Sequence, residues 1–344
     1  MNTQSVSAAA PANAPAGLPL DGERSAAQID AVLLLGPTAS GKSAMVLQLA
    51  EQFNLEVVSI DSAQVYRGLN IGTAKPSAAE RARVVHHLLD IRDPAQPYSA
   101  AEFVRDAAAA VADIRRRGRL PLIAGGTMMY ARALREGLAQ LPSADPAIRA
   151  RLAAEAAQVG WSVLHERLRR IDAATAQRLA PADRQRIGRA LEIFESCGRP
   201  MSELLAQRGA GVGALRTIAL MPQDRAQLHR RIEARFDAML RDGFLEEVRS
   251  LRARPELLGE LPALRSVGYR QAREHLELGT PFAQFRAAAL AATRQLAKRQ
   301  MTWLRSMDDA LRIDPFASDA EQRLAQAIGA DFPHFRAPAA HPWR

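Results

Sequence analysis

The sequence predicts an α/β fold in which a parallel β-sheet lies between two layers of helices, with a helical domain inserted into the chain. Apolar runs of the β type alternate with helical stretches from Asp30 onwards, a pattern typical of parallel sheets covered on both faces. Between about residues 141 and 213 the strand-like runs disappear and arginine-rich helical sequence replaces them. The chain has 344 residues, 48% of them apolar and 24% charged, which is enough for such a core.

The predicted elements follow in chain order from the first apolar run. Strands are expected at AVLLL (31–35), LEVVSI (55–60), HLLDI (87–91), LPLIAGG (120–126) and RTIALM (216–221). Helices are expected between them, for example over 43–53 and 100–117. The insertion is opened by LPSADP and closed by the glycine-rich segment RGAGVGAL.

These patterns also predict the domain boundaries. Residues 1–28, rich in Ala, Pro, Ser and Gln, are expected to be a disordered tail. The remaining parts are two portions of the core (29–140 and 214–325, the second with a basic helix), the helical insertion domain (141–213) and a C-terminal tail (326–344).

Charge and cysteine content narrow the classes of function. There are 46 Lys plus Arg against 37 Asp plus Glu, a formal net charge of +9, which favours an anionic partner such as nucleic acid or reflects arginines on a solvated surface. The single cysteine, Cys197, excludes an intrachain disulfide and a cysteine-based zinc site. Because we find neither a secretory signal pattern nor a membrane-length apolar run, we expect a cytoplasmic protein without a membrane partner.

The segment between the first strand and the first helix matches the P-loop motif G-x-x-x-x-G-K-[ST] in the context that the motif requires. Its residues are Gly36, Pro37, Thr38, Ala39, Ser40, Gly41, Lys42 and Ser43. Such a loop turns several backbone N–H groups and a helix N-terminus towards one anion, while Lys42 adds a charge and Ser43 can bind Mg²⁺. The motif predicts a bound di- or triphosphate but leaves its chemistry open.

Two further side chains follow predicted strands, where ligands collect in parallel sheets. Asp61 comes directly after the second strand and could hold magnesium through water, act as a general base, or cap a turn. Thr127 follows the fourth strand and could cap the next helix or donate a hydrogen bond to a leaving-group oxygen.

Taken in order, the motifs resemble those of a known family. They are GPTASGKS, SIDSAQVYRGLNIGTAKP, HHLLDIRDP, GGTMMY, QRIGRALEIF, RSVGYR and ATRQLAKRQMTWLR, and they extend from about residue 31 to 313. This combination closely resembles the bacterial tRNA dimethylallyltransferases, also called isopentenyl diphosphate:tRNA transferases.

The resemblance implies transfer of a dimethylallyl group from dimethylallyl diphosphate to N6 of the adenosine on the 3′ side of the tRNA anticodon, with Mg²⁺ and release of diphosphate. Asp61 would then take a proton from the amine, and Thr127 would contact the oxygen that bridges the prenyl carbon and the diphosphate. Lys42 and Arg235 would neutralise the departing diphosphate.

The resemblance also implies a set of tRNA contacts, to the anticodon arm. They are Asp61, Ser62, Ala63, Gln64, Thr127, Arg149, Gln185, Arg186, Ile187, Gly188, Arg189, Arg265, Ser266, Val267, Gly268, Tyr269, Arg270, Lys298, Arg299, Gln300, Trp303 and Arg305. Independently, Arg294, Lys298 and Arg305 lie close to one face of a predicted helix, which suits a phosphate backbone. Tyr269 and Trp303 could stack on a base or pack in the core. We expect a monomer.

Three alternatives remain open at this point. A P-loop small-molecule kinase explains the loop and Asp61 but leaves the basic helix and the RSVGYR segment without a role. An enzyme that prenylates free adenine nucleotides does not need a surface that binds RNA. An RNA-binding module that uses the loop only to hold the RNA backbone has no need of Asp61.

Overall fold

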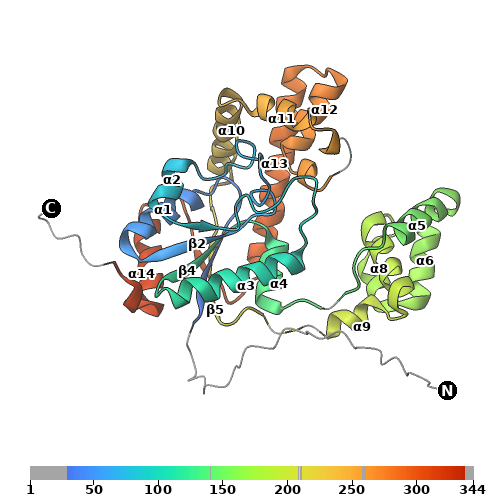
Figure 1. Ribbon diagram of the computed structural model, residues 1–344, viewed down its shortest axis with the longest axis horizontal. Coiled ribbons are helices and arrows are strands. Elements are labelled where there is room, and N and C mark those ends of the chain that lie inside the picture. The colour runs from blue at the N-terminus through green and yellow to red at the C-terminus, as the bar shows by residue number, and fades with distance from the viewer. Residues whose placement is uncertain (1–28, 140, 208, 210, 258–260, 338–344) are drawn as a thin grey trace, which may run out of the picture.

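The computed structural model describes residues 29–139, 141–207, 209, 211–257 and 261–337, so the tail expected over residues 1–28 lies outside the described residues. The core is a six-stranded sheet of order β3-β2-β4-β1-β5-β6 (Figure 1), and every pair of neighbouring strands is parallel. The strands are β1 (Ala31–Leu35), β2 (Leu55–Ile60), β3 (His86–His87), β4 (Leu120–Gly125), β5 (Leu215–Leu220) and β6 (Leu311–Ile313). The predicted α/β class with a parallel sheet is confirmed.

Two edge strands differ from the sequence prediction. The run HLLDI was expected to form a strand over 87–91, but β3 ends at His87. Leu88 and Asp90 have φ angles of 63° and 57°, a left-handed conformation that turns the chain out of the sheet. The Asp90 carboxylate there lies 2.6 Å from the buried Lys75 ammonium, so Lys75 stabilises this turn. Strand β6 was not expected, because three residues carry too little periodicity to predict.

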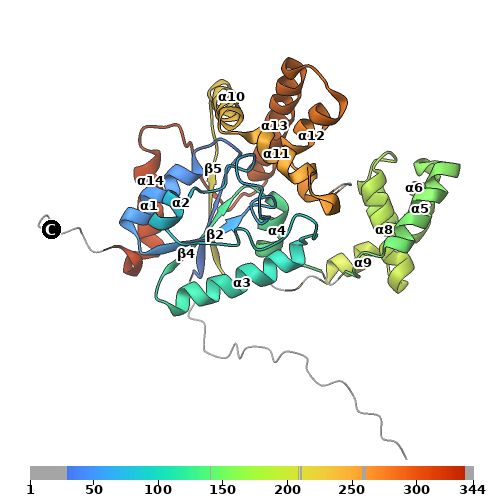
Figure 2. The same cartoon turned by 45° about the horizontal axis from the view of Figure 1, so that its top comes forward.

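Helices cover both faces of the sheet because alternate strand residues point to opposite sides. Leu33 packs in one apolar cluster with helices α3 (Ala100–Arg116) and α4 (Met128–Glu136), whereas Leu34 packs in another with α1 (Lys42–Gln52) and α14 (Ala320–Asp331). These layers are visible in Figures 1 and 2. The short helix α2 (Ala78–Arg83) follows the loop that leaves β2.

The C-terminal tail expected over residues 326–344 is wrong as far as residue 335, and its last part, residues 338–344, lies outside the described residues. Helix α14 continues to Asp331 and is followed by a short 3₁₀ helix at Pro333–Phe335. Ile328 is fully buried and Phe332 only 4% exposed, and both pack in the cluster that contains α1. The α/β core therefore extends beyond residue 325, because this amphipathic helix covers one face of the sheet.

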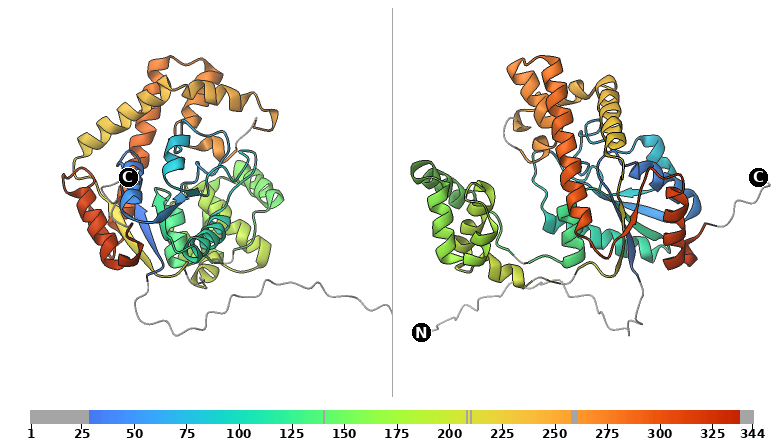
Figure 3. Two further views of the ribbon diagram at one scale, coloured as in Figure 1. Left: turned by 60° about the vertical axis from the view of Figure 1, so that its left-hand side comes forward. Right: turned by 180° about the vertical axis from the view of Figure 1, so that it is seen from behind.

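Residues 146–206 form five helices with an apolar cluster of their own. They are α5 (Pro146–Val159), α6 (Trp161–Ile171), α7 (Ala173–Arg178), α8 (Arg184–Cys197) and α9 (Met201–Ala206). Asp145 accepts two backbone N–H groups at the start of α5, with Pro146 in its first turn, so the LPSADP segment does open this unit. Figures 1 and 3 show these helices as a group beside the sheet domain.

A second helical group lies against the carboxyl edge of the sheet. Its elements are α10 (Arg225–Arg241), α11 (Phe244–Arg252), α12 (Tyr269–Leu278), α13 (Phe282–Arg305) and two 3₁₀ turns (Pro255–Leu257 and Ala263–Arg265). Phe236, Phe244 and Phe285 form its centre, together with Val65 and Leu69 from the loop after β2. In the described part of the chain, no helix has the length and apolarity needed to cross a bilayer.

Candidate active site

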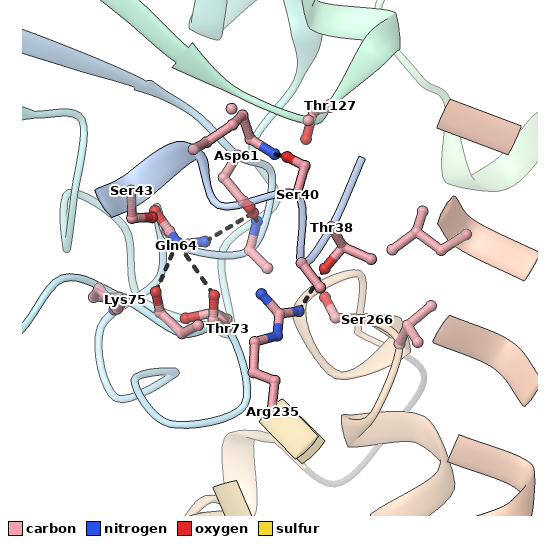
Figure 4. A pocket seen from close by; sticks show the side chains of 18 of the residues that line it. Thr38, Ser40, Ser43, Asp61, Gln64, Thr73, Lys75, Thr127, Arg235 and Ser266 are labelled. Carbon is pink, nitrogen blue, oxygen red and sulfur yellow. Dashed lines mark hydrogen bonds between the residues drawn. The ribbon is translucent and has the colours of Figure 1, made fainter. Parts of the chain in front are cut away.

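A cavity of about 840 Å³ lies between the carboxyl ends of β1, β2 and β4 and the second helical group. Many residues expected in the site line it: Thr38, Ala39, Ser40, Gly41, Lys42, Ser43, Asp61, Ser62, Ala63, Gln64, Thr127, Arg235, Arg265, Ser266, Val267, Gly268, Tyr269, Arg299, Gln300 and Trp303. Figure 4 shows Asp61, Thr127 and Arg235 approaching this space from three different elements. The fold therefore brings together groups that are far apart in the sequence.

The loop of residues 36–41, called the phosphate loop below, joins β1 to α1. Gly41 has a φ of 95°, which favours glycine, and a Cβ on Gly36 would lie 2.9 Å from Ser40 Oγ and 3.0 Å from Leu220 Cβ. The Lys42 ammonium donates to Gly36 O and Pro37 O, both at 2.8 Å, and more weakly to Ser40 Oγ at 3.4 Å. The loop thus curls around the position of its own lysine at a helix N-terminus, as expected for an anion site.

Two arginines from α10 donate hydrogen bonds to the phosphate loop. Arg235 Nη2 donates to Thr38 Oγ1, and Arg231 Nε donates to Ala39 O at 2.9 Å. Arg231 was not predicted from the sequence, although it precedes Arg235 by one helical turn and therefore shares its face. Figure 4 shows Arg235 reaching from α10 to Thr38.

Lys42 and Arg235, which both line the cavity, lie close enough to affect each other's pKa. Burial, together with the charge of Arg235, lowers the pKa of Lys42 to about 7, and Asp61 opposes this decrease. Burial also lowers the pKa of Arg235, again opposed by Asp61. Within the described residues neither Lys42 nor Arg235 forms an ion pair. An anion bound between them would compensate the cost of burying the two positive charges and would offset the repulsion between them.

This lowered pKa predicts proton uptake when a diphosphate binds. Near pH 8 most Lys42 side chains are neutral, and a bound anion raises the lysine pKa, so binding should take up as much as about one proton. The affinity should therefore decrease as the pH rises through the free-protein pKa of about 7. Calorimetry in buffers of different ionisation enthalpy measures the uptake. Lys42→Arg, which stays charged, should abolish it, and uptake that persists in this variant would contradict the assignment.

Asp61 and Thr127 are linked across the opposite side of the cavity. Asp61 Oδ1 accepts the backbone N–H groups of Ala63 (2.8 Å) and Gln64 (3.3 Å), which fixes the carboxylate in a turn at the end of β2. Thr127 Oγ1 accepts Ser62 N–H at 3.0 Å and donates to Ser62 Oγ at 3.3 Å. Thr127 occupies the N-cap position of α4, but its side chain makes no capping hydrogen bond. Its hydroxyl is directed to the Asp61 loop instead.

The side chain of Gln64 is partly buried and is held by three hydrogen bonds. Its Oε1 accepts the Ser59 hydroxyl at 3.1 Å, and its Nε2 donates to Thr73 O and Ala74 O at 3.2 and 3.3 Å. These bonds tie the loop around Thr73 to the end of β2 (Figure 4). The side chain of Gln64 thus shapes one wall of the cavity.

Known proteins are similar to this chain over most of its length. The IPP transferase family model matches residues 64–307. The tRNA dimethylallyltransferase of Bordetella petrii is 58% identical over 301 residues, which are 86% of this chain and 96% of the relative. That of Stenotrophomonas maltophilia strain R551-3 is 55% identical over 305 residues, 87% of this chain and 96% of the relative. The chain belongs to the IPP transferase family.

Solved structures agree with this assignment. The full-length tRNA isopentenylpyrophosphate transferase of Bacillus halodurans is 32% identical with a TM-score of 0.65, covering 89% of this chain and 97% of the other. A eukaryotic dimethylallyltransferase acting on tRNA is 27% identical with a TM-score of 0.75, covering 90% of this chain and 81% of the other. The resemblance drawn from the motifs is confirmed: the chain is a prenyltransferase, and the kinase alternative is not favoured.

Three side chains expected to touch RNA in this IPP transferase are buried instead. Ile187 is fully buried in the apolar cluster of the insertion, and Gln300 is 7% exposed. Tyr269 is fully buried, and its hydroxyl donates to Glu247 Oε1 at 2.5 Å. Packing decides these positions, because each side chain lies on the inward face of its helix.

The Glu247 carboxylate explains why Tyr269 is internal. It also accepts the backbone N–H groups of Asn70, Ile71 and Gly72 at 2.8–3.1 Å, so it anchors a cavity loop to α11. Burial and the negative charge of Glu247 raise the pKa of Tyr269, which keeps the phenol protonated. Tyr269 therefore supports the wall of the cavity from inside.

Tyr269→Phe tests this reassignment. The free energy of unfolding should decrease by about 1.5–3 kcal/mol, because one buried hydrogen bond to a carboxylate is lost, while the Kd for tRNA should stay within about twofold. Chemical denaturation and filter binding measure the two quantities. Weaker tRNA binding by a variant of unchanged stability would restore Tyr269 as an RNA contact.

Other predicted RNA contacts are exposed, and those named here lie outside the cavity lining except for Trp303. On α13, Lys298 and Arg305 are exposed, as are Gln185 and Arg186 on α8 and Arg270 on α12. Trp303, at the cavity wall, is 38% exposed, with the Arg132 guanidinium 5.7 Å from its ring centre. The lysine and the arginines among these residues extend the cationic surface beyond the cavity.

In the insertion, two predicted contacts share one buried carboxylate. Glu192 is fully buried, and Arg149 Nε lies 3.0 Å and Arg189 Nη1 2.9 Å from its carboxylate oxygens. Gly188 allows the Trp161 ring to approach, since a Cβ there would lie 3.3 Å from it. The arginines are therefore held in fixed positions at one end of the insertion.

The residues of this IPP transferase fit a magnesium ion that is bound together with a phosphate ligand. Ser43, the predicted ligand, is exposed at the start of α1. Among the residues that the structure describes, no group of three or more His, Cys, Asp or Glu side chains could hold a metal. Mg²⁺ usually keeps several waters and binds only one or two protein oxygens plus substrate phosphates. A hydroxyl beside the phosphate loop meets that requirement.

Proposed function

We propose that this protein transfers a dimethylallyl group from dimethylallyl diphosphate to N6 of the adenosine next to the anticodon on its 3′ side in tRNA. The single observation that carries the proposal is one cavity that brings Lys42 and Arg235, which form no ion pair among the described residues, to the phosphate loop, with Asp61 and Thr127 at the facing strand ends. The names of the similar proteins support the choice of prenyl donor and of tRNA.

The diphosphate of the donor would lie in the phosphate loop. Backbone N–H groups and the N-terminus of α1 supply partial positive charge, and Lys42 and Arg235 supply full charges. A diphosphate becomes a good leaving group only when its developing charge is compensated, so these groups would lower the barrier to departure. Residues 36–43 as a whole would form this subsite.

The acceptor amine would lie between Asp61 and the prenyl carbon. Its nitrogen forms a bond to C1 of the prenyl group while the bond from C1 to the bridging oxygen breaks and diphosphate leaves. The amine proton goes to Asp61, whose orientation is fixed by its bonds to Ala63 and Gln64 N–H. The Thr127 hydroxyl would donate to the bridging oxygen as its negative charge develops.

Mg²⁺ bound to the diphosphate oxygens and Ser43 would supply further charge neutralisation to the leaving group. The protein residues nonetheless supply the orientation of both substrates. Holding the amine and the prenyl carbon in contact contributes much of the rate in a reaction between two bound molecules.

The tRNA would be held by the cationic surfaces outside the cavity. An adenosine must leave the stacked anticodon loop to reach a base inside a protein, as is usual for enzymes that modify nucleobases. Lys298 and Arg305 on α13 and Arg149 and Arg186 in the insertion would contact the phosphate backbone. Since one chain supplies both subsites, we expect a monomer to be sufficient, acting where tRNA matures, in the cytoplasm.

Transfer of label tests this function. The purified protein is incubated with Mg²⁺, unmodified tRNA and dimethylallyl diphosphate labelled in the prenyl group, with parallel reactions in which AMP replaces tRNA or ATP replaces the prenyl donor. Label retained on tRNA is expected. Label on AMP alone would favour prenylation of free nucleotides, and ATP turnover without transfer would favour a kinase.

A further inference from the structure

We propose that Gln300 is a positioning residue that fixes the phosphate loop relative to Thr127. Its side chain joins two strand ends: Oε1 accepts Thr38 N–H at 2.9 Å, and Nε2 donates to Gly126 O at 2.8 Å. The partners determine the orientation of the amide, because an N–H can only donate and a carbonyl can only accept. This inference rests on the proposed function, since it concerns the geometry of that reaction.

The two bonds connect groups that would act on opposite ends of the breaking bond. Thr38 belongs to the phosphate loop, and its hydroxyl also accepts from Arg235. Gly126 precedes Thr127, whose hydroxyl is bonded to Ser62 beside Asp61. Through Gln300, hydrogen bonds and the short backbone segments of Thr38 and Gly126–Thr127 therefore link Arg235 to the acceptor side of the cavity.

The backbone alone does not hold these segments together beyond the sheet. Strands β1 and β4 pair as far as Leu35 and Gly125, and a longer bond of 3.3 Å joins Gly36 N to Gly125 O. After that point one segment curls into the phosphate loop and the other enters α4. The amide of Gln300, 7% exposed, lies where the two segments separate.

The glycine at position 126 independently supports the contact between the Gln300 amide and the end of β4. A Cβ at this position would lie 2.5 Å from Gln300 Nε2, so the approach of the amide depends on glycine. The same turn of α13 carries Arg299 towards the cavity. The helix that faces the RNA thus also fixes the diphosphate subsite.

The test uses Gln300→Met, which keeps the length of the side chain but removes both hydrogen bonds. Calorimetry with inorganic diphosphate and Mg²⁺ should show binding about 10- to 100-fold weaker, and kcat for prenyl transfer should decrease as well. The Kd for tRNA should stay within about threefold. Gln48→Met, a glutamine on α1 outside the cavity lining, is the matched control and should leave both values unchanged.

Gln300→Glu provides a readout that a purely structural role would not change. A protonated glutamic acid can both accept from Thr38 and donate to Gly126, whereas the carboxylate repels the carbonyl. The ratio of its diphosphate Kd to that of the wild type should therefore decrease as the pH falls from about 8 to about 5.5. Gln300→Met should show no such recovery.

If Gln300→Met does not fold, Gly126→Ala displaces the amide while leaving it in the chain and should weaken diphosphate binding in the same range. A folded Gln300→Met with unchanged diphosphate Kd and kcat would overturn the proposal. Because diphosphate binding is measured without tRNA, a failure of prenyl transfer in the wild type would reject the proposed function by a separate observation.

Discussion

Replacing Asp61 by asparagine is expected to lower kcat for prenyl transfer by about 10²- to 10⁴-fold, the usual contribution of a general base. Asparagine keeps the oxygen that accepts Ala63 and Gln64 N–H, so the turn after β2 should persist. Only the ability to take the amine proton is lost. Single-turnover transfer of labelled prenyl group to tRNA measures the rate, and filter binding should give a tRNA Kd within about threefold of the wild type.

Asp93→Asn is the matched control for this variant. Asp93 Oδ1 accepts Ala95 N–H at 2.9 Å in a turn of the same kind, and it lies outside the cavity lining. Its replacement should leave kcat unchanged. Parallel losses of tRNA binding and transfer in Asp61→Asn would contradict the base assignment and indicate a contact role for Asp61.

Replacing Lys42 by methionine is expected to lower kcat/KM for dimethylallyl diphosphate by about 10²- to 10³-fold. The thioether occupies the space of the lysine stem but cannot compensate the charge of the leaving group. Arg235, which shares the anion site, would then bind the diphosphate without Lys42, but it would no longer be repelled by the lysine charge. The tRNA Kd should change by less than about threefold, because Lys42 faces the phosphate loop.

Lys298→Met makes the corresponding change on the exposed face of α13. This variant should have a higher KM for tRNA and a weaker salt dependence of tRNA binding, with little change in the KM for the prenyl donor. The two lysine variants thus separate the diphosphate subsite from the RNA surface. Equal effects of Lys42→Met on both substrates would contradict this division.

The central sheet could be predicted because its strands are continuous apolar runs. The expected runs at 31–35 and 55–60 match β1 and β2. The run at 120–126 is one residue longer than β4, and the run at 216–221 is shifted by one residue at both ends relative to β5. Strands β3 and β6 have two and three residues, too few for any period to emerge. Helix α14 was not predicted, because its apolar residues can be recognised as part of the core only from the sheet face that they cover.

The chemical groups of the site could be predicted for a related reason. Lys42, Asp61 and Thr127 all follow strands, and parallel strands bring their carboxyl ends to one edge. Helical positions could not be assigned in the same way. Arg299 and Gln300 are neighbours in α13, yet one is exposed beside the cavity and the other is 7% exposed between two loops. Only tertiary packing distinguishes a side chain that can contact RNA from one that joins two loops inside the protein.

The most direct test of the central claim is the position and identity of the nucleoside that receives the prenyl group. Wild-type protein is given labelled dimethylallyl diphosphate and either a tRNA with adenosine 3′ to the anticodon or the same tRNA with guanosine there, and the RNA is digested to nucleosides. The account predicts label in N6-(dimethylallyl)adenosine from the first tRNA and none from the second. Label at another nucleoside, or equal label in both tRNAs, would contradict it.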